Sequence, residues 1–179
     1  MKNNIDRILL AKEEIAEKVK DLANQIKNEY SDKKPIILCI LKGSLIFTAD
    51  LVRELDFPCT IDFMQVSSYG AGTETTGKLV VKKDMDTDIS GRDVIVVEDI
   101  LDTGVTLSNL LPELRRRGAR DVKLCVLLNK PERRKAEVAA DYIGFDIENE
   151  FVVGYGLDYN EEYRNLPYIG ILKRSVYEK

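Results

Sequence analysis

Continuous apolar runs and amphipathic stretches alternate along this chain. The runs at 36–41, 94–97 and 122–128 are apolar at nearly every position, which is typical of strands buried on both faces of a sheet. The pattern predicts strands at residues 36–41, 60–66, 79–81, 94–97, 122–128, 142–145, 151–153 and 168–172. It predicts helices at residues 5–28, 45–55 and 106–117. This order indicates an α/β fold with a mainly parallel, twisted sheet flanked by helices.

The organisation of the chain favours one domain. Its 179 residues are enough for one core, and no repeat, low-complexity tract or linker divides them. We therefore expect residues 1–179 to form a single domain. The N-terminal helix and the last residues are expected to form a small hood over the sheet.

Composition removes several kinds of chemistry. The chain has no histidine, which excludes Ser-His-Asp and Cys-His nucleophile systems and histidine-bound zinc. Carboxylates, lysines, backbone groups and an oxygen-liganded Mg²⁺ remain. Cys39, Cys59 and Cys125 are widely spaced and are expected to be buried thiols in a reducing compartment.

Charge and hydropathy favour a cytoplasmic protein. The net charge of −4 provides no general attraction for nucleic acid or an anionic membrane, so neither partner is expected. No apolar stretch approaches the roughly 20 residues that span a bilayer, and the N-terminus lacks the apolar core of a signal peptide. An anionic substrate would have to be bound by a few groups at one site rather than by the overall charge of the protein.

The region after the strand at 94–97 carries the strongest chemical signal. Glu98 and Asp99 follow this strand, at the end where open α/β sheets bind ligands. The run 102–106 (Asp-Thr-Gly-Val-Thr) then opens a helix, where Gly104 lets backbone N–H groups approach a phosphate. Carboxylates beside a phosphate would repel it. Their presence is therefore explained only if they bind another part of the ligand, such as sugar hydroxyls, or a metal. A phosphorylated ribose with a metal-bound pyrophosphate satisfies both demands.

These residues resemble a known family. Residues 96–106 resemble the 5-phosphoribosyl pyrophosphate (PRPP) motif of the type I phosphoribosyltransferases. Four further features resemble the hypoxanthine-guanine branch of this family. They are Leu-Lys-Gly at 41–43, Ser-Tyr at 68–69, Lys130, and residues 151–160 with Arg164. The motifs span residues 36–172 in the order and spacing of the family.

The resemblance implies a type I phosphoribosyltransferase fold with a hood, and a reaction. The reaction is Mg²⁺-dependent transfer of the 5-phosphoribosyl group from PRPP to N9 of hypoxanthine or guanine. Pyrophosphate is released and the product is IMP or GMP, as in purine salvage. The resemblance also implies a homodimer or homotetramer.

The resemblance implies roles for the residues that would hold PRPP. Glu98 and Asp99 would hold the ribose 2′- and 3′-hydroxyls, and Asp102 would be the acid/base facing purine N7. The 5′-phosphate loop would be Thr103, Gly104, Val105 and Thr106. The pyrophosphate would be bound by Lys42, Gly43 and Arg164, and the peptide between Lys42 and Gly43 can be cis in the family.

It implies further roles around the base and the leaving group. Lys130 would donate to the purine O6, Phe151 would stack on the base, and the backbone of Val152 would read its pairing edge. The metal ligands would be Glu98, Asp99 and Asp158. Ser68 and Tyr69 would close the site, within a lid at residues 67–78.

Other interpretations remain beside this one. The same fold could serve a PRPP-responsive regulator that binds nucleic acid, although the acidic chain lacks a basic surface. A transferase for another base is a weaker alternative, and Lys130 together with Phe151 and Val152 argues against it. Gly72–Leu79 nearly fits a P-loop, but Leu79 lacks the required hydroxyl. Residues 133–135 are expected to be a solvated charge run, and Tyr159 and Tyr163 to be packing or subunit contacts.

Overall fold

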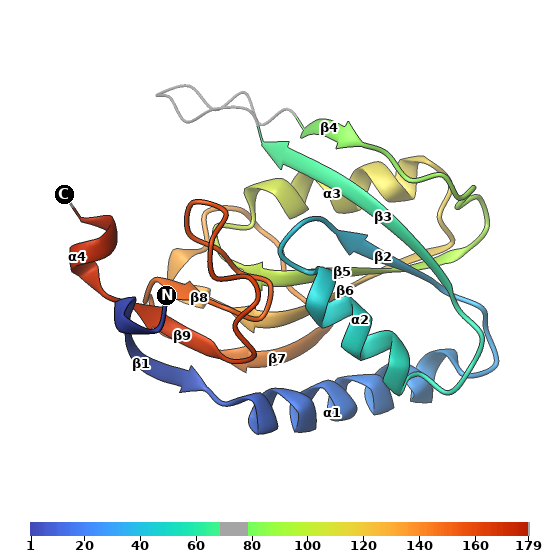
Figure 1. Cartoon of the computed structure of the whole chain (residues 1–179). Coiled ribbons are helices and arrows are strands. Elements are labelled where there is room, and N and C mark those ends of the chain that lie inside the picture. Colours follow the sequence, from blue (N-terminus) through green and yellow to red (C-terminus); the bar gives the residue numbers. More distant parts are fainter. Residues whose placement is uncertain (69–78, 179) are drawn as a thin grey trace.

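The computed structural model describes residues 1–68 and 79–178, and in this part of the chain six strands form the main sheet (Figure 1). Their order is β4-β3-β2-β5-β6-β7; β4 is antiparallel to β3, and the other neighbouring pairs are parallel. The strands are β2 (Ile36–Ile40), β3 (Thr60–Ser68), β4 (Leu79–Lys83), β5 (Asp93–Leu101), β6 (Asp121–Asn129) and β7 (Tyr142–Asp146). The expected mainly parallel α/β fold is confirmed.

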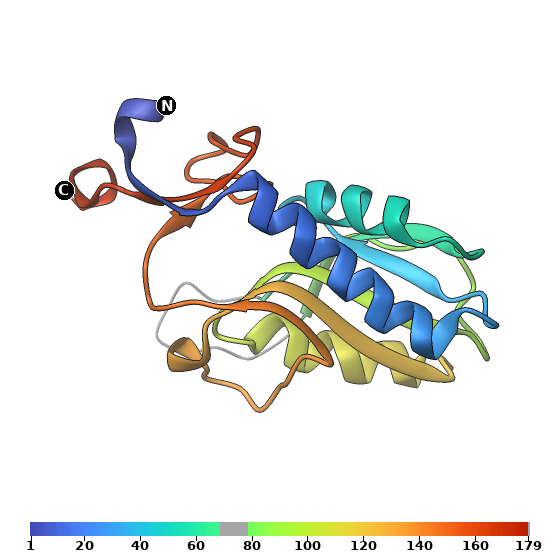
Figure 2. The same ribbon diagram turned by 90° about the horizontal axis from the view of Figure 1, so that it is seen from below.

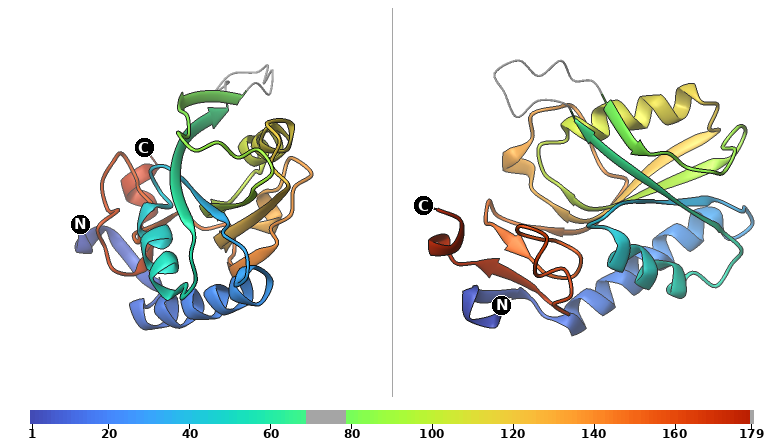
Figure 3. Two further views of the ribbon diagram at one scale, coloured as in Figure 1. Left: turned by 90° about the vertical axis from the view of Figure 1, so that its right-hand side faces the viewer. Right: turned by 45° about the horizontal axis from the view of Figure 1, so that its top comes forward.

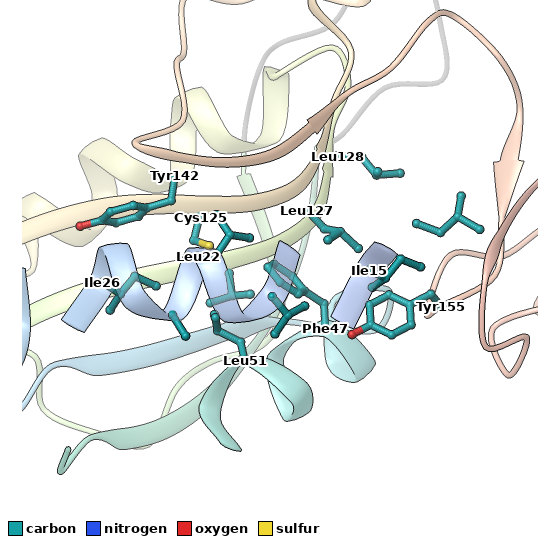
Figure 4. Close-up of a cluster of buried hydrophobic side chains, with 14 of the residues drawn as sticks. Ile15, Leu22, Ile26, Phe47, Leu51, Cys125, Leu127, Leu128, Tyr142 and Tyr155 are labelled. Atoms are coloured by element: carbon teal, nitrogen blue, oxygen red, sulfur yellow. The ribbon is translucent and has the colours of Figure 1, made fainter. Parts of the chain in front are cut away.

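Helices cover both faces of this sheet. The helices are α1 (Lys12–Tyr30), α2 (Leu45–Glu54), α3 (Val105–Arg116) and the short α4 (Arg174–Tyr177), with 3₁₀ turns at Lys2–Asn4 and Pro131–Arg133. Alternation in β5 directs Ile95 and Val97 toward α1 and α2. Figure 4 shows side chains of these two helices packed together in the same cluster. The same alternation directs Val94 and Val96 toward α3 on the other face.

A second, smaller sheet lies beside the carboxyl ends of the main strands (Figure 2). It consists of β1 (Ile5–Leu10), β9 (Ile169–Leu172) and β8 (Val152–Val153), in the order β1-β9-β8. We call this sheet, with α4, the hood; both chain ends lie in it (Figure 3).

The expected helix at 5–28 is wrong in its first part. Ile5–Leu10 is a strand, and α1 begins only at Lys12, where the backbone N–H of Ala11 donates to the Glu14 carboxylate at 2.8 Å. Two register shifts interrupt the pairing of β1 with β9. Such irregularities hide the two-residue alternation that would otherwise have indicated a strand.

The order of strands places a crevice between β2 and β5. Beyond β2 the sheet continues to β3, and beyond β5 it continues to β6, so the connections after these neighbours leave in opposite directions. Open α/β sheets bind their ligands at such a switch point. Since β5 extends to Leu101, Glu98 and Asp99 lie in its last part rather than after it.

The expectations for the cysteines and for membrane-spanning segments are tested in part. Cys39 and Cys125 are buried free thiols, but the free thiol Cys59 is only partly buried. No helix in the described part of the chain has the length and apolar character needed to cross a membrane.

Candidate active site

The loop that follows β2 touches the last part of β5 at the switch point. A Cβ atom at Gly43 would lie 1.7 Å from Oδ2 of Asp99, so a larger residue would force this carboxylate or the loop to move. A third segment meets them, because a Cβ at Gly156 would lie 2.0 Å from the carbonyl oxygen of Gly43. Gly156 also has a φ of +103°, a conformation that favours glycine. Three segments that are distant in sequence therefore converge here.

Burial raises the pKa of both carboxyl groups in the last part of β5, Glu98 and Asp99. It raises the pKa of Asp99 to about 6, although Oδ1 accepts a hydrogen bond from the N–H of Ile100 at 2.8 Å. Burial, and then the neighbouring Asp99, raise the pKa of Glu98 well above its ordinary value. Within the described residues, Oε2 of Glu98 is buried without a hydrogen-bond partner. The contacts of the described residues therefore do not offset the cost of burying these two charges.

The raised pKa of Asp99 predicts a pH-dependent stability. Between about pH 4 and pH 6 the folded protein keeps a proton that the unfolded chain has released, so stability falls as pH rises through this window. Asp99→Asn cannot titrate, and in metal-free protein it should be more stable than the original chain at pH 7.5 by about 2–3 kcal/mol. The difference should largely vanish near pH 4.

Urea unfolding at pH 4.0 and 7.5 measures this difference. Asp86→Asn is the matched control, because the Asp86 side chain is 95% exposed. A stability difference for Asp99→Asn that is equal at both pH values would contradict the prediction.

The phosphate-loop candidates form the start of α3. Gly104 precedes the helix with a φ of +78°, and its carbonyl accepts the first helical bond from the N–H of Ser108 at 2.9 Å. The carbonyl of Thr103 accepts from the N–H groups of Lys135 and Ala136 at 2.9 and 3.2 Å, which anchors the loop. Val105 and Thr106 are the first residues of the helix. The motif thus presents a helix N-terminus toward the crevice, as a phosphate site requires.

The pyrophosphate candidates come from the loops after β2 and β8. Nη1 of Arg164 donates to the carbonyl of Gly156 at 2.7 Å, and Nη2 lies 2.8 Å from the Asp158 carboxylate. Lys42 follows a cis peptide, which joins Leu41 to Lys42 and is one bond earlier than the position that the resemblance implied. The N–H of Leu41 still bonds to the carbonyl of Met64 at 2.8 Å, so the chain turns only after this residue.

A cavity of about 460 Å³ opens between the main sheet and the hood. Its volume suits a small ligand. It is lined by the predicted residues Asp102, Lys130, Phe151 and Val152, and by Ile100, Arg133, Asn149, Glu150, Leu157, Arg174, Tyr177 and Glu178. The structure therefore brings the acid/base candidate and the three base-binding candidates to one place.

Lys130 is held at the wall of this cavity. It is only 7% exposed, its Nζ donates to the carbonyl of Glu150 at 2.6 Å, and its N–H donates to the carbonyl of Leu101 at 3.0 Å. Burial lowers the pKa of the ammonium group. One of the three ammonium donors is used, which leaves donors for a ligand.

Phe151 and Val152 begin the strand β8 at the other wall. The carbonyl of Phe151 accepts from the N–H of Leu172 at 2.8 Å, so strand alternation turns the N–H and C=O of Val152 away from β9. In the described part of the hood, β8 is an edge strand on that side. The backbone of Val152 is thus positioned to pair with a planar ligand.

An aromatic cluster supports Phe151. Tyr177 of α4 stacks on it with ring centroids 4.8 Å apart, and Tyr159 meets it edge-on at 5.5 Å. The hydroxyl of Tyr159 donates to the carbonyl of Val176 at 3.4 Å. Tyr163 is buried in the hood, where its hydroxyl accepts from the side chain of Asn4 at 2.8 Å. Both Tyr159 and Tyr163 therefore make packing contacts within the chain.

Asp102 has a partner that the sequence did not reveal. Nε of Arg133 lies 3.1 Å from Oδ1 of Asp102 at the cavity wall. Arg134 donates to the side chain of Asn129 at 2.6 Å. Arg133 and Lys135 are exposed, as expected of a solvated charge run at 133–135, whereas Arg134 is partly buried, so the expectation is wrong for Arg134. Nothing in a run of three cations indicates which of them pairs with Asp102.

The lid candidates lie largely outside the described residues. Ser68 ends β3, where its backbone pairs with Leu79 of β4. Tyr69, and residues 72–78 of the P-loop-like run, are not among the residues that the structure describes.

The chain matches known proteins over its whole length. Residues 7–160 match the model of the phosphoribosyl transferase domain. Hypoxanthine-guanine phosphoribosyltransferase of Bacillus subtilis (strain 168) is 49% identical over 178 residues, which cover 99% of each chain. The protein of the same name from Streptococcus pneumoniae (strain R6) is 51% identical over 177 residues, covering 99% of this chain and 98% of that one.

Solved structures agree with the sequence comparison. The crystal structure of a hypoxanthine phosphoribosyltransferase from Staphylococcus aureus superimposes with a TM-score of 0.97. It is 46% identical, and the match covers 100% of this chain and 97% of that chain. The chain therefore belongs to the phosphoribosyltransferase family, as a member of its hypoxanthine-guanine branch.

Proposed function

We propose that this protein transfers the 5-phosphoribosyl group of PRPP to N9 of hypoxanthine or guanine and releases pyrophosphate. The observation that carries this function is the cavity that joins Asp102, Lys130, Phe151 and Val152 beside the start of α3. It offers a proton acceptor, an O6 donor, an aromatic face and a backbone edge next to a phosphate loop. The products would be IMP or GMP, as in purine salvage.

The ribose 5-phosphate would lie between α3 and β5. Backbone N–H groups and hydroxyls of residues 103–106 would bind the 5′-phosphate, where the helix dipole favours negative charge. Glu98 and Asp99 would accept hydrogen bonds from the ribose hydroxyls. The unpartnered Oε2 of Glu98 supports this role, because a bound donor would remove the cost of its burial.

The leaving pyrophosphate would be bound by Lys42, the Gly43 turn and Arg164. Positive charge grows on the ribose as negative charge grows on pyrophosphate, and these cations would stabilise the latter. Because Gly43 has no side chain, its backbone can approach both Asp99 and the leaving group.

The carboxylates fit a magnesium site that is completed by the substrate. In residues 1–68 and 79–178, no three carboxylate or thiol side chains converge to hold a metal alone. Mg²⁺ commonly takes one or two carboxylates and completes its shell with phosphate oxygens and water. Glu98, Asp99 and Asp158 would hold it, and when bound it would neutralise charge on the pyrophosphate.

Asp102 would act on the proton of the base. An ionised carboxylate facing N7 can accept the proton that the purine loses as N9 becomes the nucleophile. The guanidinium of Arg133, whose Nε lies 3.1 Å from Oδ1, would hold this carboxylate at the cavity wall.

Lys130→Ala is expected to lower kcat/KM for hypoxanthine by about 10- to 100-fold, since a hydrogen bond from a buried cation to O6 would be lost. Steady-state kinetics with hypoxanthine as the varied substrate measure this effect. Lys135→Ala is the control, because it removes an exposed charge from the same connection. Unchanged kinetics in Lys130→Ala would show that Lys130 does not read O6.

A spectrophotometric assay tests the function as a whole. Purified protein with PRPP and Mg²⁺ is offered hypoxanthine, guanine, xanthine and adenine in parallel. Nucleotide should form from hypoxanthine or guanine and not from adenine, whose 6-amino group would face the Lys130 donors. Product from none of the bases would contradict the proposal. The regulator alternative is not supported, because the close full-length relatives are named as transferases.

Assembly and location belong to the same proposal. Family membership favours a homodimer or homotetramer that works in the cytoplasm on PRPP and free bases, with no nucleic-acid or membrane partner. Light scattering coupled to size-exclusion chromatography would measure the subunit number, and a monomer would contradict this part.

A further inference from the structure

Glu161 lies between the two cations that would bind pyrophosphate. Its Oε2 is 3.0 Å from Nζ of Lys42 and 3.4 Å from Nη2 of Arg164. One carboxylate oxygen thus contacts cations from two loops, one after β2 and one after β8. The nearby Lys42, and to a lesser extent Arg164, lower the pKa of Glu161, so it is ionised at neutral pH.

The backbone of the loop fixes Glu161 in this place. Its N–H donates to Oδ2 of Asp158 at 2.9 Å, and Oδ1 of the same carboxylate lies 2.8 Å from Nη2 of Arg164. Glu161 has a φ of +64° and Asn160 a φ of +55°, which are uncommon for residues with side chains. The left-handed conformation of Asn160 and Glu161 turns the Glu161 side chain back toward Lys42 and Arg164.

Lys42 and Arg164 retain hydrogen-bond donors that a larger anion could use. Nε of Arg164 is buried and has no hydrogen-bond partner within the described residues. The Lys42 and Glu161 side chains are 54% and 65% exposed, so their ion pair opens to solvent. Phosphate oxygens seek the same lysine and guanidinium donors that the carboxylate occupies. Glu161 therefore competes with any phosphate that approaches both cations.

We propose that Glu161 is an internal counter-ion that holds Lys42 and Arg164 in the absence of pyrophosphate and must be displaced when pyrophosphate binds. It is a positioning residue that weakens pyrophosphate binding and so favours release of this product. The inference rests on the proposed function, in which these two cations bind the leaving group.

The expected size of the effect follows from the exposure of the pair. Exposed ion pairs contribute little, so removing the competing carboxylate should tighten pyrophosphate binding by about two- to fivefold. The sign of the change is the stronger criterion. A residue that only supports the loop would weaken binding when it is replaced, whereas a competitor strengthens binding.

Glu161→Gln tests this, since it keeps the length of the side chain and removes its charge. Titration calorimetry with pyrophosphate and Mg²⁺ should give a Kd about two- to fivefold lower than in the original chain. Glu162→Gln is the matched control: it removes the same charge from the neighbouring exposed position, where the backbone pairs with Tyr159. Its Kd should stay unchanged.

Each other result overturns the inference. A higher or unchanged Kd in Glu161→Gln would exclude competition. An equal gain of affinity in Glu161→Gln and Glu162→Gln would show that the effect comes from net charge alone. If Glu161→Gln does not fold, Glu161→Asn serves instead, because asparagine tolerates the positive φ. If the original chain neither binds pyrophosphate nor forms nucleotide, the proposed function fails; if it does both and Glu161→Gln matches it, only this inference fails.

Discussion

Asp102→Asn is expected to lower kcat by about 10²- to 10⁴-fold, which is the usual contribution of a positioned acid or base. Asparagine has nearly the shape of aspartate and can still accept a hydrogen bond from Arg133, but it cannot take the proton of the base. The Asp102 side chain lies on the cavity wall, and the phosphate loop begins one residue later. The Kd of PRPP should therefore change much less than kcat.

Single-turnover kinetics and PRPP titration separate the two quantities. Arg133→Gln is a useful companion variant, because it leaves the carboxylate in place and removes its cationic neighbour at 3.1 Å. It should lower kcat less than Asp102→Asn does, since the carboxylate that takes the proton is still present. A near-normal kcat in Asp102→Asn would exclude the acid/base role.

Gly43→Ala is expected to lower kcat/KM for PRPP by at least about 100-fold. The added Cβ would lie 1.7 Å from Oδ2 of Asp99, so the Asp99 carboxylate, which would hold the ribose, or the loop after β2 must move. Displacements of about 1 Å in an active site can cost this much in rate. Steady-state kinetics with PRPP as the varied substrate measure the loss.

The double variant Gly43→Ala, Asp99→Ala separates the clash from the chemistry. Removing the Asp99 carboxylate makes room for the new methyl group, so the melting temperature that Gly43→Ala lowers should recover. Activity should not recover, because Asp99 itself is lost. A Gly43→Ala protein with normal stability and normal PRPP kinetics would show that the close contact is not required.

The main sheet could be predicted from the sequence because its signals are local. The apolar runs that became β2, β5 and β6 are buried on both faces, and Gly43, Gly104 and Pro131 follow them in turn. The strand at Ile5–Leu10 could not be recognised, since bulges break its alternation and its partner β9 lies at the other end of the chain. Tertiary pairing decided the conformation of this segment.

The candidate site was predictable where residue type and chain position coincide. Glu98, Asp102 and Lys130 follow or end core strands, so the fold itself brings them to one edge of the sheet. Arg133 and Tyr177 lie in segments whose pattern indicates a solvated surface. The contact of Arg133 with Asp102 joins the connections after β6 and β5, and the contact of Tyr177 with Phe151 lies within the hood, so both arise only in the tertiary structure.

The pairing of β1 with β9 bears on how the protein is made. Ile5 pairs with Leu172, so the first strand to leave the ribosome must wait for the last before it gains its partner. The main sheet between them needs only segments that are synthesised earlier. Because long-range pairings form late and open easily, the hood should close after the sheet during synthesis. A nascent chain that already has the phosphate loop would thus still lack its purine pocket.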